Sequence, residues 1–391
     1  MKITSIEATP VSIPLDEPLR WGAMSVGVKG GVVVTVTTDE GIVGLGEAGF
    51  SAEYFPTVGP IVNDQLAPLL VGKDPLEIGA RWQEMFEATH MWGRRGIETY
   101  AISGVDIALW DILGKVTGQP VYRLLGANKS KARAYFAPSL KNVGQVVDES
   151  VAAVESGFTA IKLRVGSKLD EAAELVAAVR NAVGDEIDLM VDANMSYDRR
   201  DALHLARSLE ALGVYWLEEP IRTRSLTQYV EENSWLADRC DIRLAGGESL
   251  LTRFEYLELL ERRTFDILQP DCVSVGGISE AKRVADMASA WNIECVPHIA
   301  CSSGTGIGLA AGLHLVLACA NAPLVEFDAY RGLGWDGFLE QPLEIEDGLV
   351  AALDAPGLGI ELASGAVERF GLEGALAASQ NGNVAVRGGT G

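Results

Sequence analysis

The sequence predicts an α/β protein built around a (β/α)8 barrel, and two observations lead to this prediction. Short apolar segments alternate with amphipathic sequence such as EAAELVAAVRNAV, and the segments recur eight times between residues 132 and 328. Eight strand–helix repeats over about 200 residues are typical of a ring of parallel strands surrounded by helices. A doubly wound open sheet is the alternative. The eight predicted strands cover residues 132–137, 159–165, 187–193, 214–219, 242–248, 265–270, 293–298 and 323–328.

The sequence on either side of these repeats has a different pattern. Residues 30–50 predict two strands joined by a turn at 39–41. Residues 60–127 predict helices, because apolar residues recur at three- and four-residue spacing. After residue 330 the alternation stops, and PLEIEDGLVAALDAPGLGIEL predicts strands and turns that return to the N-terminal part. The last stretch, ALAASQNGNVAVRGGTG, lacks periodicity and predicts a loose tail.

Composition excludes several kinds of partner. The 391 residues include 32 Lys and Arg against 54 Asp and Glu, a formal net charge of −22 at pH 7. Such a surface repels nucleic acid and anionic membranes. The five cysteines have no CxxC or metal-finger spacing, which indicates a reducing compartment. With no visible signal peptide or membrane span, the sequence predicts a soluble, cytoplasmic protein.

Polar and ionisable side chains gather where the predicted strands end. The active site of such a barrel lies at the carboxyl ends of its strands. Seven consecutive predicted strands deliver these groups to one rim, mostly after apolar runs. The groups are Lys162, Arg164, Asp192, Asn194, Glu218, Glu219, Glu248, Asp271, His298 and Glu326.

Three of the carboxylates, Asp192, Glu218 and Glu248, come from three successive predicted strands. Carboxylates that converge on one point repel one another unless a cation neutralises them. An all-oxygen ligand set suits Mg²⁺ and leaves positions for water and substrate. The alternative is that each carboxylate separately caps a helix or pairs with an arginine.

Asp271 and His298 end adjacent predicted strands. A carboxylate beside a histidine orients the ring and holds one tautomer. The chain has four histidines, and His204 and His314 fall within helical patterns. His298 is the one at a strand end, so it is the candidate base; a structural histidine is the alternative.

Lys162 and Arg164 lie two residues apart, so they share one face of their strand. The face is either a wet strand edge or the mouth of the barrel. A closed barrel has no free edge, which favours inward charges that offset an anionic substrate and the three carboxylates.

Two glycine-rich motifs imitate phosphate-binding loops. GLGEAG (44–49) matches G-x-G-x-x-G but leads into prolines rather than a helix. SSGTGIGLAAG (302–312) lacks the lysine of a P-loop, and we interpret it as a tight turn into a helix that helps to hold a carboxylate.

With these residues identified, the chain resembles the mandelate racemase branch of the enolase superfamily from about residue 1 to 371. AISGVDIALWDILGKVTGQPVYRLLG, the Lys-x-Arg pair, VDAN, WLEEP, GGES, QPD, VPH and PLVEFD occur in the family's order. The resemblance implies a (β/α)7β barrel over an N-terminal α+β capping domain completed by C-terminal residues. It divides the chain into a cap (1–127), a barrel (128–335), a returning segment (336–371) and a flexible tail (372–391).

The resemblance also implies roles for the rim residues. Mg²⁺ would be held by Asp192, Glu218 and Glu248, and Asp271 and His298 would form the catalytic dyad. The implied reaction removes the proton alpha to a carboxylate and forms an ene-diolate, whose charge Mg²⁺ offsets.

The remaining implied roles concern the substrate. Glu326 would hydrogen-bond the substrate carboxylate, and Asn194 would contact the substrate. Lys162, and Glu326 if protonated, would add hydrogen bonds that strengthen as negative charge develops on the substrate carboxylate.

Arg164 departs from mandelate racemase, which has a lysine base at this position. A guanidinium stays protonated, because its pKa lies above about 12. One base, His298, favours syn-dehydration of an acid sugar to a 2-keto-3-deoxy acid. A racemase, epimerase or cycloisomerase is the alternative, and a non-catalytic metal-binding or assembly protein would not need so complete a set of reacting groups.

Substrate identity would lie in cap loops around Arg20, Trp21, Met24 and Phe55, although Trp21 and Phe55 could equally belong to the cap core. The resemblance also implies a homo-oligomer, a dimer or an octamer, that acts on a small carboxylate such as an acid sugar.

Overall fold

The computed structural model describes residues 1–21, 24–49, 57–93, 95–138, 141–299, 305–328, 337–351 and 354–371. The side chains of residues 14–27 and 328 lie outside this description, and so does the predicted tail, residues 372–391.

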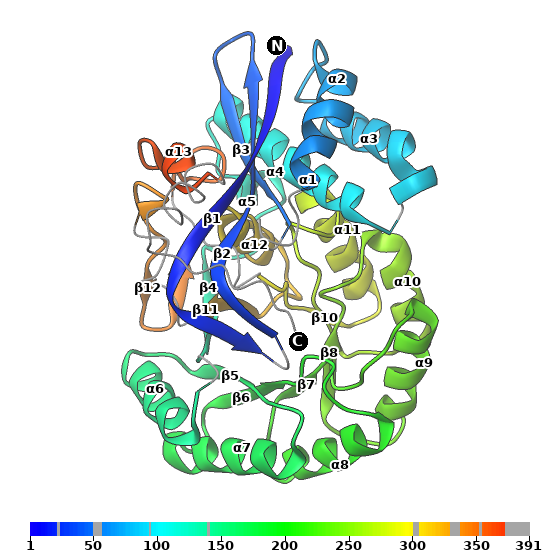
Figure 1. The fold of residues 1–391 in the computed structure, drawn as a ribbon, viewed down its shortest axis with the longest axis vertical. Coiled ribbons are helices and arrows are strands. Elements are labelled where there is room, and N and C mark those ends of the chain that lie inside the picture. The colour runs from blue at the N-terminus through cyan, green and yellow to red at the C-terminus, as the bar shows by residue number, and fades with distance from the viewer. Residues whose placement is uncertain are drawn as a thin grey trace, which may run out of the picture.

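The N-terminal part is an antiparallel sheet covered by helices (Figure 1). The predicted turn at 39–41 joins its second and third strands, and Gly41 has a φ of +80° there, a conformation that favours glycine. The helices expected over residues 60–127 are confirmed. The elements are β1 (Ile3–Trp21), β2 (Met24–Thr38), β3 (Val43–Ala48), α1 (Val58–Pro60), η1 (Ile61–Leu66), α2 (Ala67–Leu70), α3 (Ile78–Gly93), α4 (Ile97–Thr117) and α5 (Val121–Leu124).

The glycines of GLGEAG allow strand β3 to pack closely on helix α4. A Cβ on Gly44 would collide with the carbonyl oxygen of Ala108, and a Cβ on Gly46 would collide with that of Gly104. Close backbone approach is a common reason for glycine in a strand. These two glycines are therefore explained by packing.

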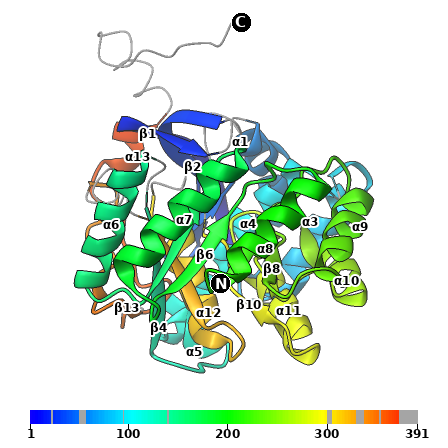
Figure 2. The same ribbon diagram turned by 90° about the horizontal axis from the view of Figure 1, so that it is seen from below.

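The barrel predicted from the strand–helix repeats is confirmed (Figure 2). Strands β4 to β10 lie side by side in sequence order and are parallel, and β11 pairs in parallel with β4. Cys295 of β10 donates its N–H to the carbonyl of Asn321, just before β11, at 2.8 Å. The alternative of an open doubly wound sheet is therefore wrong. The strands are β4 (Lys131–Ala137), β5 (Ala160–Arg164), β6 (Asp188–Asp192), β7 (Trp216–Glu218), β8 (Arg243–Gly246), β9 (Ile267–Leu268), β10 (Glu294–Cys295) and β11 (Leu324–Asp328).

One helix lies between each pair of successive barrel strands, which gives the (β/α)7β order. Several of these helices begin at a capping side chain, as when Asp198 accepts hydrogen bonds from the N–H groups of Arg200 and Asp201. The helices are α6 (Val143–Glu155), α7 (Leu169–Val183), α8 (Arg199–Glu210), α9 (Leu226–Ala237), α10 (Thr252–Arg262), α11 (Gly277–Ala290) and α12 (Ile307–Ala318).

A compact apolar layer fills the interior of the barrel. Each strand, or the residue just after it, contributes one buried side chain to this layer, so the barrel is a packed core rather than a channel. The residues are Tyr135, Ala160, Met190, Trp216, Ala245, Ile267, Val296 and Leu324.

The C-terminal segment contacts both the barrel and the cap. Strand β13 (Leu349–Ala351) pairs antiparallel with the first half of β4 and with β12 (Ile345–Glu346). Gly357 bridges to Pro120, and Gly371, just after α13 (Ala366–Phe370), bridges to Val11. The pairing of β13 with a barrel strand was not expected from the sequence.

Three buried or part-buried hydrogen bonds join the cap to the start of α11. Gly276 N donates to Ser103 Oγ at 2.9 Å, and Ser279 N donates to Asp106 Oδ2 at 2.9 Å. The Trp82 indole donates to the Gly276 carbonyl at 2.8 Å. The carboxylate of Asp106 on α4 therefore occupies the amino end of a barrel helix, where negative charge is favourable.

Candidate active site

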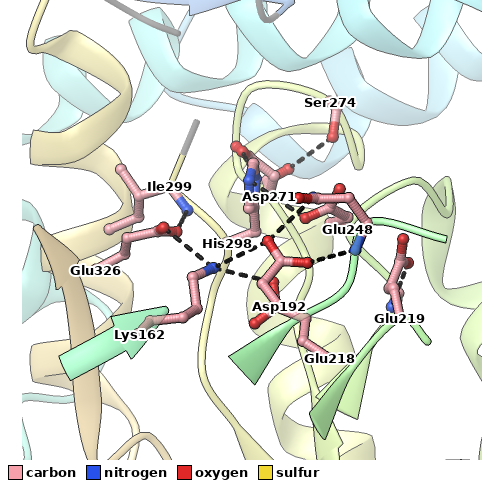
Figure 3. A network of polar contacts seen from close by, with 12 residues as sticks. Lys162, Asp192, Glu218, Glu219, Glu248, Asp271, Ser274, His298, Ile299 and Glu326 are labelled. Carbon is pink, nitrogen blue, oxygen red and sulfur yellow. Dashed lines mark hydrogen bonds and ion pairs between the residues drawn. The ribbon is translucent and has the colours of Figure 1, made fainter. Parts of the chain in front are cut away.

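Lys162 points into the barrel mouth from β5 (Figure 3) and is 1% exposed. Burial lowers the pKa of Lys162, but the surrounding carboxylates, Glu218 foremost, outweigh burial and raise this pKa well above its usual value. The lysine therefore carries a buried positive charge, and the wet-edge alternative is wrong. Its Nζ lies 3.0 Å from Glu218 Oε1, 3.2 Å from Glu326 Oε1 and 3.9 Å from Asp192 Oδ2.

Asp192, Glu218 and Glu248 come from neighbouring strands at the same rim. Asp192 and Glu218 are paired residues of β6 and β7, and Glu248 follows β8. The exposed fractions of their side chains are 4%, 0% and 25%, so Glu248 is the one most open to the mouth. Asn194 donates to both oxygens of Asp192, from its backbone N at 2.9 Å and its Nδ2 at 3.0 Å.

The three carboxylates raise one another's pKa. Burial is the main cause for each, and repulsion adds to it: Glu248 acts on Asp192, Asp192 acts on Glu218, and Glu218 acts on Glu248. A bound cation would relieve this repulsion between buried carboxylates.

The donor chemistry of this site fits a divalent cation. Five carboxylates face three cationic side chains, so the number of acidic groups exceeds the number of cations. Among the described residues no three His, Cys, Asp or Glu side chains are arranged around one point as metal ligands. Lys162 Nζ pairs with Glu218, and His298 Nε2 pairs with Glu248. The carboxylates are Asp192, Glu218, Glu248, Asp271 and Glu326, and the cations are Lys162, Arg164 and His298.

His298 and Asp271 form a hydrogen-bonded pair. His298 Nδ1 lies 2.7 Å from Asp271 Oδ2, and the Val273 N–H donates to the other Asp271 oxygen at 2.9 Å. This fixes the ring so that Nε2 faces the mouth, 3.4 Å from Glu248 Oε2. Burial lowers the pKa of His298, but Glu248, Asp271 and Glu326 outweigh burial and raise it to about 10. Because Glu248 contributes most to this rise, the protonation of His298 depends on what Glu248 binds.

Glu326, which would donate a hydrogen bond to the substrate only if protonated, has a low pKa in this site. Burial alone would raise its pKa, but Lys162, His298 and Arg164 hold this pKa at about 2. Ile299 N donates to Glu326 Oε2 at 3.2 Å. Glu326 therefore acts in this arrangement as an acceptor that anchors Lys162.

Two family matches cover most of the chain. Residues 3–126 match the mandelate racemase / muconate lactonizing enzyme N-terminal domain. Residues 145–366 match the enolase C-terminal domain-like family. The chain belongs to the mandelate racemase branch of the enolase superfamily. The resemblance seen in the sequence and the prediction of a superfamily enzyme are confirmed.

Similar proteins of this superfamily have several activities. An arabinonate dehydratase from Saccharolobus solfataricus is 37% identical over 87% of this chain and 90% of its own length. A D-galactarolactone cycloisomerase from Agrobacterium fabrum is 33% identical over 95% of this chain and 99% of its own length. A solved racemase from Streptomyces coelicolor with bound magnesium is 28% identical, with a TM-score of 0.85 over 95% of this chain and all of its own.

The described residues contain no helix long and apolar enough to cross a membrane.

Trp216 is a site residue that the sequence reasoning missed. Its indole Nε1 donates to Glu218 Oε2 at 3.1 Å, from within the apolar layer of the barrel. Both Glu218 oxygens are therefore engaged, one by Trp216 and one by Lys162. The two-residue spacing of Trp216 and Glu218 could have indicated this contact, because residues two apart on a strand share a face.

Glu219 belongs to a separate buried network rather than to the carboxylate group. Tyr229 donates its hydroxyl to Glu219 Oε1 at 2.6 Å, and Gly247 N donates to the Tyr229 oxygen at 2.8 Å. Tyr256 donates its hydroxyl to the Gly247 carbonyl at 2.6 Å. These bonds fix the backbone immediately before Glu248.

The predicted cap residues of the site stay predictions. Phe55 lies outside the described residues. The backbones of Arg20, Trp21 and Met24 lie where β1 and β2 pair, but their side chains also lie outside the description.

Proposed function

We propose that this protein dehydrates an acid sugar, an aldonate or aldarate, to a 2-keto-3-deoxy acid. Support comes chiefly from the asymmetry of the mouth: one imidazole, His298, is oriented by its carboxylate, and a guanidinium replaces the second base. Arg164 Nη2 lies 3.9 Å from Glu326, which favours its protonated form. The similarity to an arabinonate dehydratase is consistent with this reaction.

His298 would carry the proton through both half-reactions. Its Nε2 takes the proton from C2 of the substrate while Asp271 holds Nδ1. The C–H electron pair moves toward the carboxylate. The same Nε2–H then protonates the 3-hydroxyl, the C3–O bond breaks, and water leaves from the same face. The enol that remains takes a proton at C3 and releases its C2 hydroxyl proton to solvent, which gives the 2-keto acid.

The other residues would bind the substrate and stabilise the negative charge that develops on its carboxylate. Lys162 donates to the substrate carboxylate as negative charge grows there. Arg164 binds a substrate hydroxyl, and Asn194 contacts the substrate beside Asp192. Glu326 completes the group by accepting from Lys162 and orienting it toward the substrate carboxylate; a hydrogen bond from Glu326 itself to that carboxylate would require Glu326 to be protonated.

Asp192, Glu218 and Glu248 would hold Mg²⁺, which supplies Lewis-acid stabilisation of the carboxylate dianion when bound. We further propose that the cap loops select the sugar and that the chain forms a homo-oligomer in the cytoplasm.

Product analysis tests the reaction. The protein is incubated with Mg²⁺ and a panel of aldonic and aldaric acids, and 2-keto acid is measured by semicarbazide absorbance and by NMR. We expect keto acid from at least one acid, and none from His298→Asn. Epimerised acid as the sole product would show that dehydration is wrong.

A cycloisomerase is the second candidate, because the relative from Agrobacterium fabrum matches almost the whole chain. Incubation with the corresponding sugar-acid lactones distinguishes the two. Ring opening to a keto acid without loss of water would favour the isomerase.

A further inference from the structure

Two glycine-rich motifs that the proposed chemistry leaves unused meet in the structure. Glu47 Oε2, in GLGEAG on β3, accepts a hydrogen bond from Thr305 Oγ1 at 2.6 Å and from Gly308 N at 2.8 Å. Glu47, Thr305 and Gly308 are all buried. The carboxylate at the amino end of α12 is thus supplied by the cap, and the helix dipole favours it there.

The same strand also reaches the segment that follows Asp271. Gly49, just after β3, donates its N–H to the Val273 carbonyl at 3.0 Å, and Val273 N in turn donates to Asp271 Oδ1 at 2.9 Å. The end of β3 therefore contacts both the start of α12 and Val273, which holds Asp271.

We propose that Glu47 is a positioning residue for the dyad: by anchoring β3 to Thr305 and Gly308 at the start of α12 it fixes the end of this strand, whose Gly49 holds Val273 and thereby Asp271, the partner of His298. This inference rests on the proposed function for its kinetic readout. Removal of the carboxylate leaves two buried donors without their acceptor and removes the anchor of β3, so we expect the end of this strand, and Asp271 with it, to shift. A displacement of about 1 Å in a reacting group lowers the rate by about 100-fold.

A matched control exists at the opposite end of the barrel. Arg180 is buried and donates to the carbonyl oxygens of Gly184, Ile187, Leu212 and Gly213, which precede β6 and β7. Its loss should destabilise the barrel without touching the dyad.

The experiment compares Glu47→Ala, Glu47→Gln and Arg180→Ala in the full chain. With ¹⁵N-labelled histidine, the chain's four histidines are few enough to resolve, and His298→Asn assigns the His298 signals. We expect Glu47→Ala to move the His298 Nδ1–H resonance and to lower kcat about 10- to 100-fold with KM changed less than about 3-fold. Glu47→Gln keeps an acceptor oxygen and should restore most of the rate. Arg180→Ala should lower Tm and leave kcat and the resonance unchanged.

An unmoved His298 resonance and wild-type kcat in folded Glu47→Ala would overturn the proposal, because Glu47 would then serve stability alone. If Glu47→Ala does not fold, Thr305→Val removes one donor at constant volume, and we expect a smaller shift of the same resonance. No shift in that variant overturns the proposal equally. If the wild-type protein makes no keto acid, the proposed function fails, while the resonance still tests the role of Glu47.

Discussion

Trp216 donates its indole N–H to the carboxylate of Glu218, two residues further along the same strand, at 3.1 Å. A packed core residue of the barrel thereby holds a carboxylate of the active site. Such outer partners orient a metal ligand and raise its affinity for the ion.

Trp216→Phe should weaken Mg²⁺ binding about 10-fold, because Glu218 loses the donor that fixes its orientation. Isothermal titration calorimetry with Mg²⁺ measures the change. Met190→Leu, in the same apolar layer, is the control and should leave the affinity unchanged. Equal affinities for wild-type protein and Trp216→Phe would contradict an orienting role for the indole.

Glu248→Gln should abolish the stabilisation of the fold by Mg²⁺. A ligand that binds only the native state raises stability by about 2.7 kcal/mol at 100 times its Kd. We therefore expect Mg²⁺ to raise the Tm of the wild-type protein and to leave that of Glu248→Gln nearly unchanged in differential scanning calorimetry. The same Mg²⁺-dependent rise in both proteins would remove Glu248 from the ligand set.

Arg164→Met should separate proton removal from loss of water. His298 and Asp271 are unaltered in this variant, so we expect exchange of the C2 proton with solvent deuterium to continue, while keto acid formation falls at least 10-fold. Proton NMR in D₂O follows both processes in one sample. Loss of exchange together with dehydration would instead show that Arg164 takes part in the proton transfer.

Asp106 should make stability fall as the pH rises. Burial is the main cause that raises its pKa from 3.8 to about 7. The folded protein then binds the Asp106 proton more tightly than the unfolded chain does. The stability gained from this proton is complete below about pH 4 and is lost by about pH 7. Its upper limit is about 4 kcal/mol. Asp106→Asn should remove this loss, as measured by urea unfolding at pH 5, 6, 7 and 8.

His314 acts in the opposite direction and must be separated in that experiment. It is buried between the Tyr122 N–H and the Leu358 carbonyl, and burial lowers its pKa to about 4. Its contribution is present above about pH 6.5 and declines as the pH falls to about 4. Comparison of Asp106→Asn with wild type at each pH cancels it. Parallel stability curves would contradict the role of Asp106.

The barrel and the charged residues of its mouth could be predicted because both leave a local pattern. Strand–helix alternation marks β4 to β11, and single charged residues after apolar runs mark Lys162, Asp192, Glu218 and His298. The number of strands and the direction of Lys162 are as expected. Most of the actual strands are shorter than predicted, and only two residues at β9 and at β10 pair as a ladder.

The features that the sequence did not disclose join distant parts of the chain. Glu47 meets Thr305 across 258 positions, and Asp106 meets Ser279 across 173. No periodicity records such pairings. The sequence left the protonation of Glu326 open for a related reason: its low pKa depends on three cations that only the fold brings together.

The filled interior of the barrel has a practical consequence. The apolar layer from Tyr135 to Leu324 closes any passage through the barrel. The charged residues of the mouth therefore lie at one end, and the opposite end is the inert end. Exposed turns at Gly184 and Gly213 lie at the inert end. A surface tether or a fluorescent label attached at these turns would leave substrate entry free, which makes them suitable points for immobilising the enzyme.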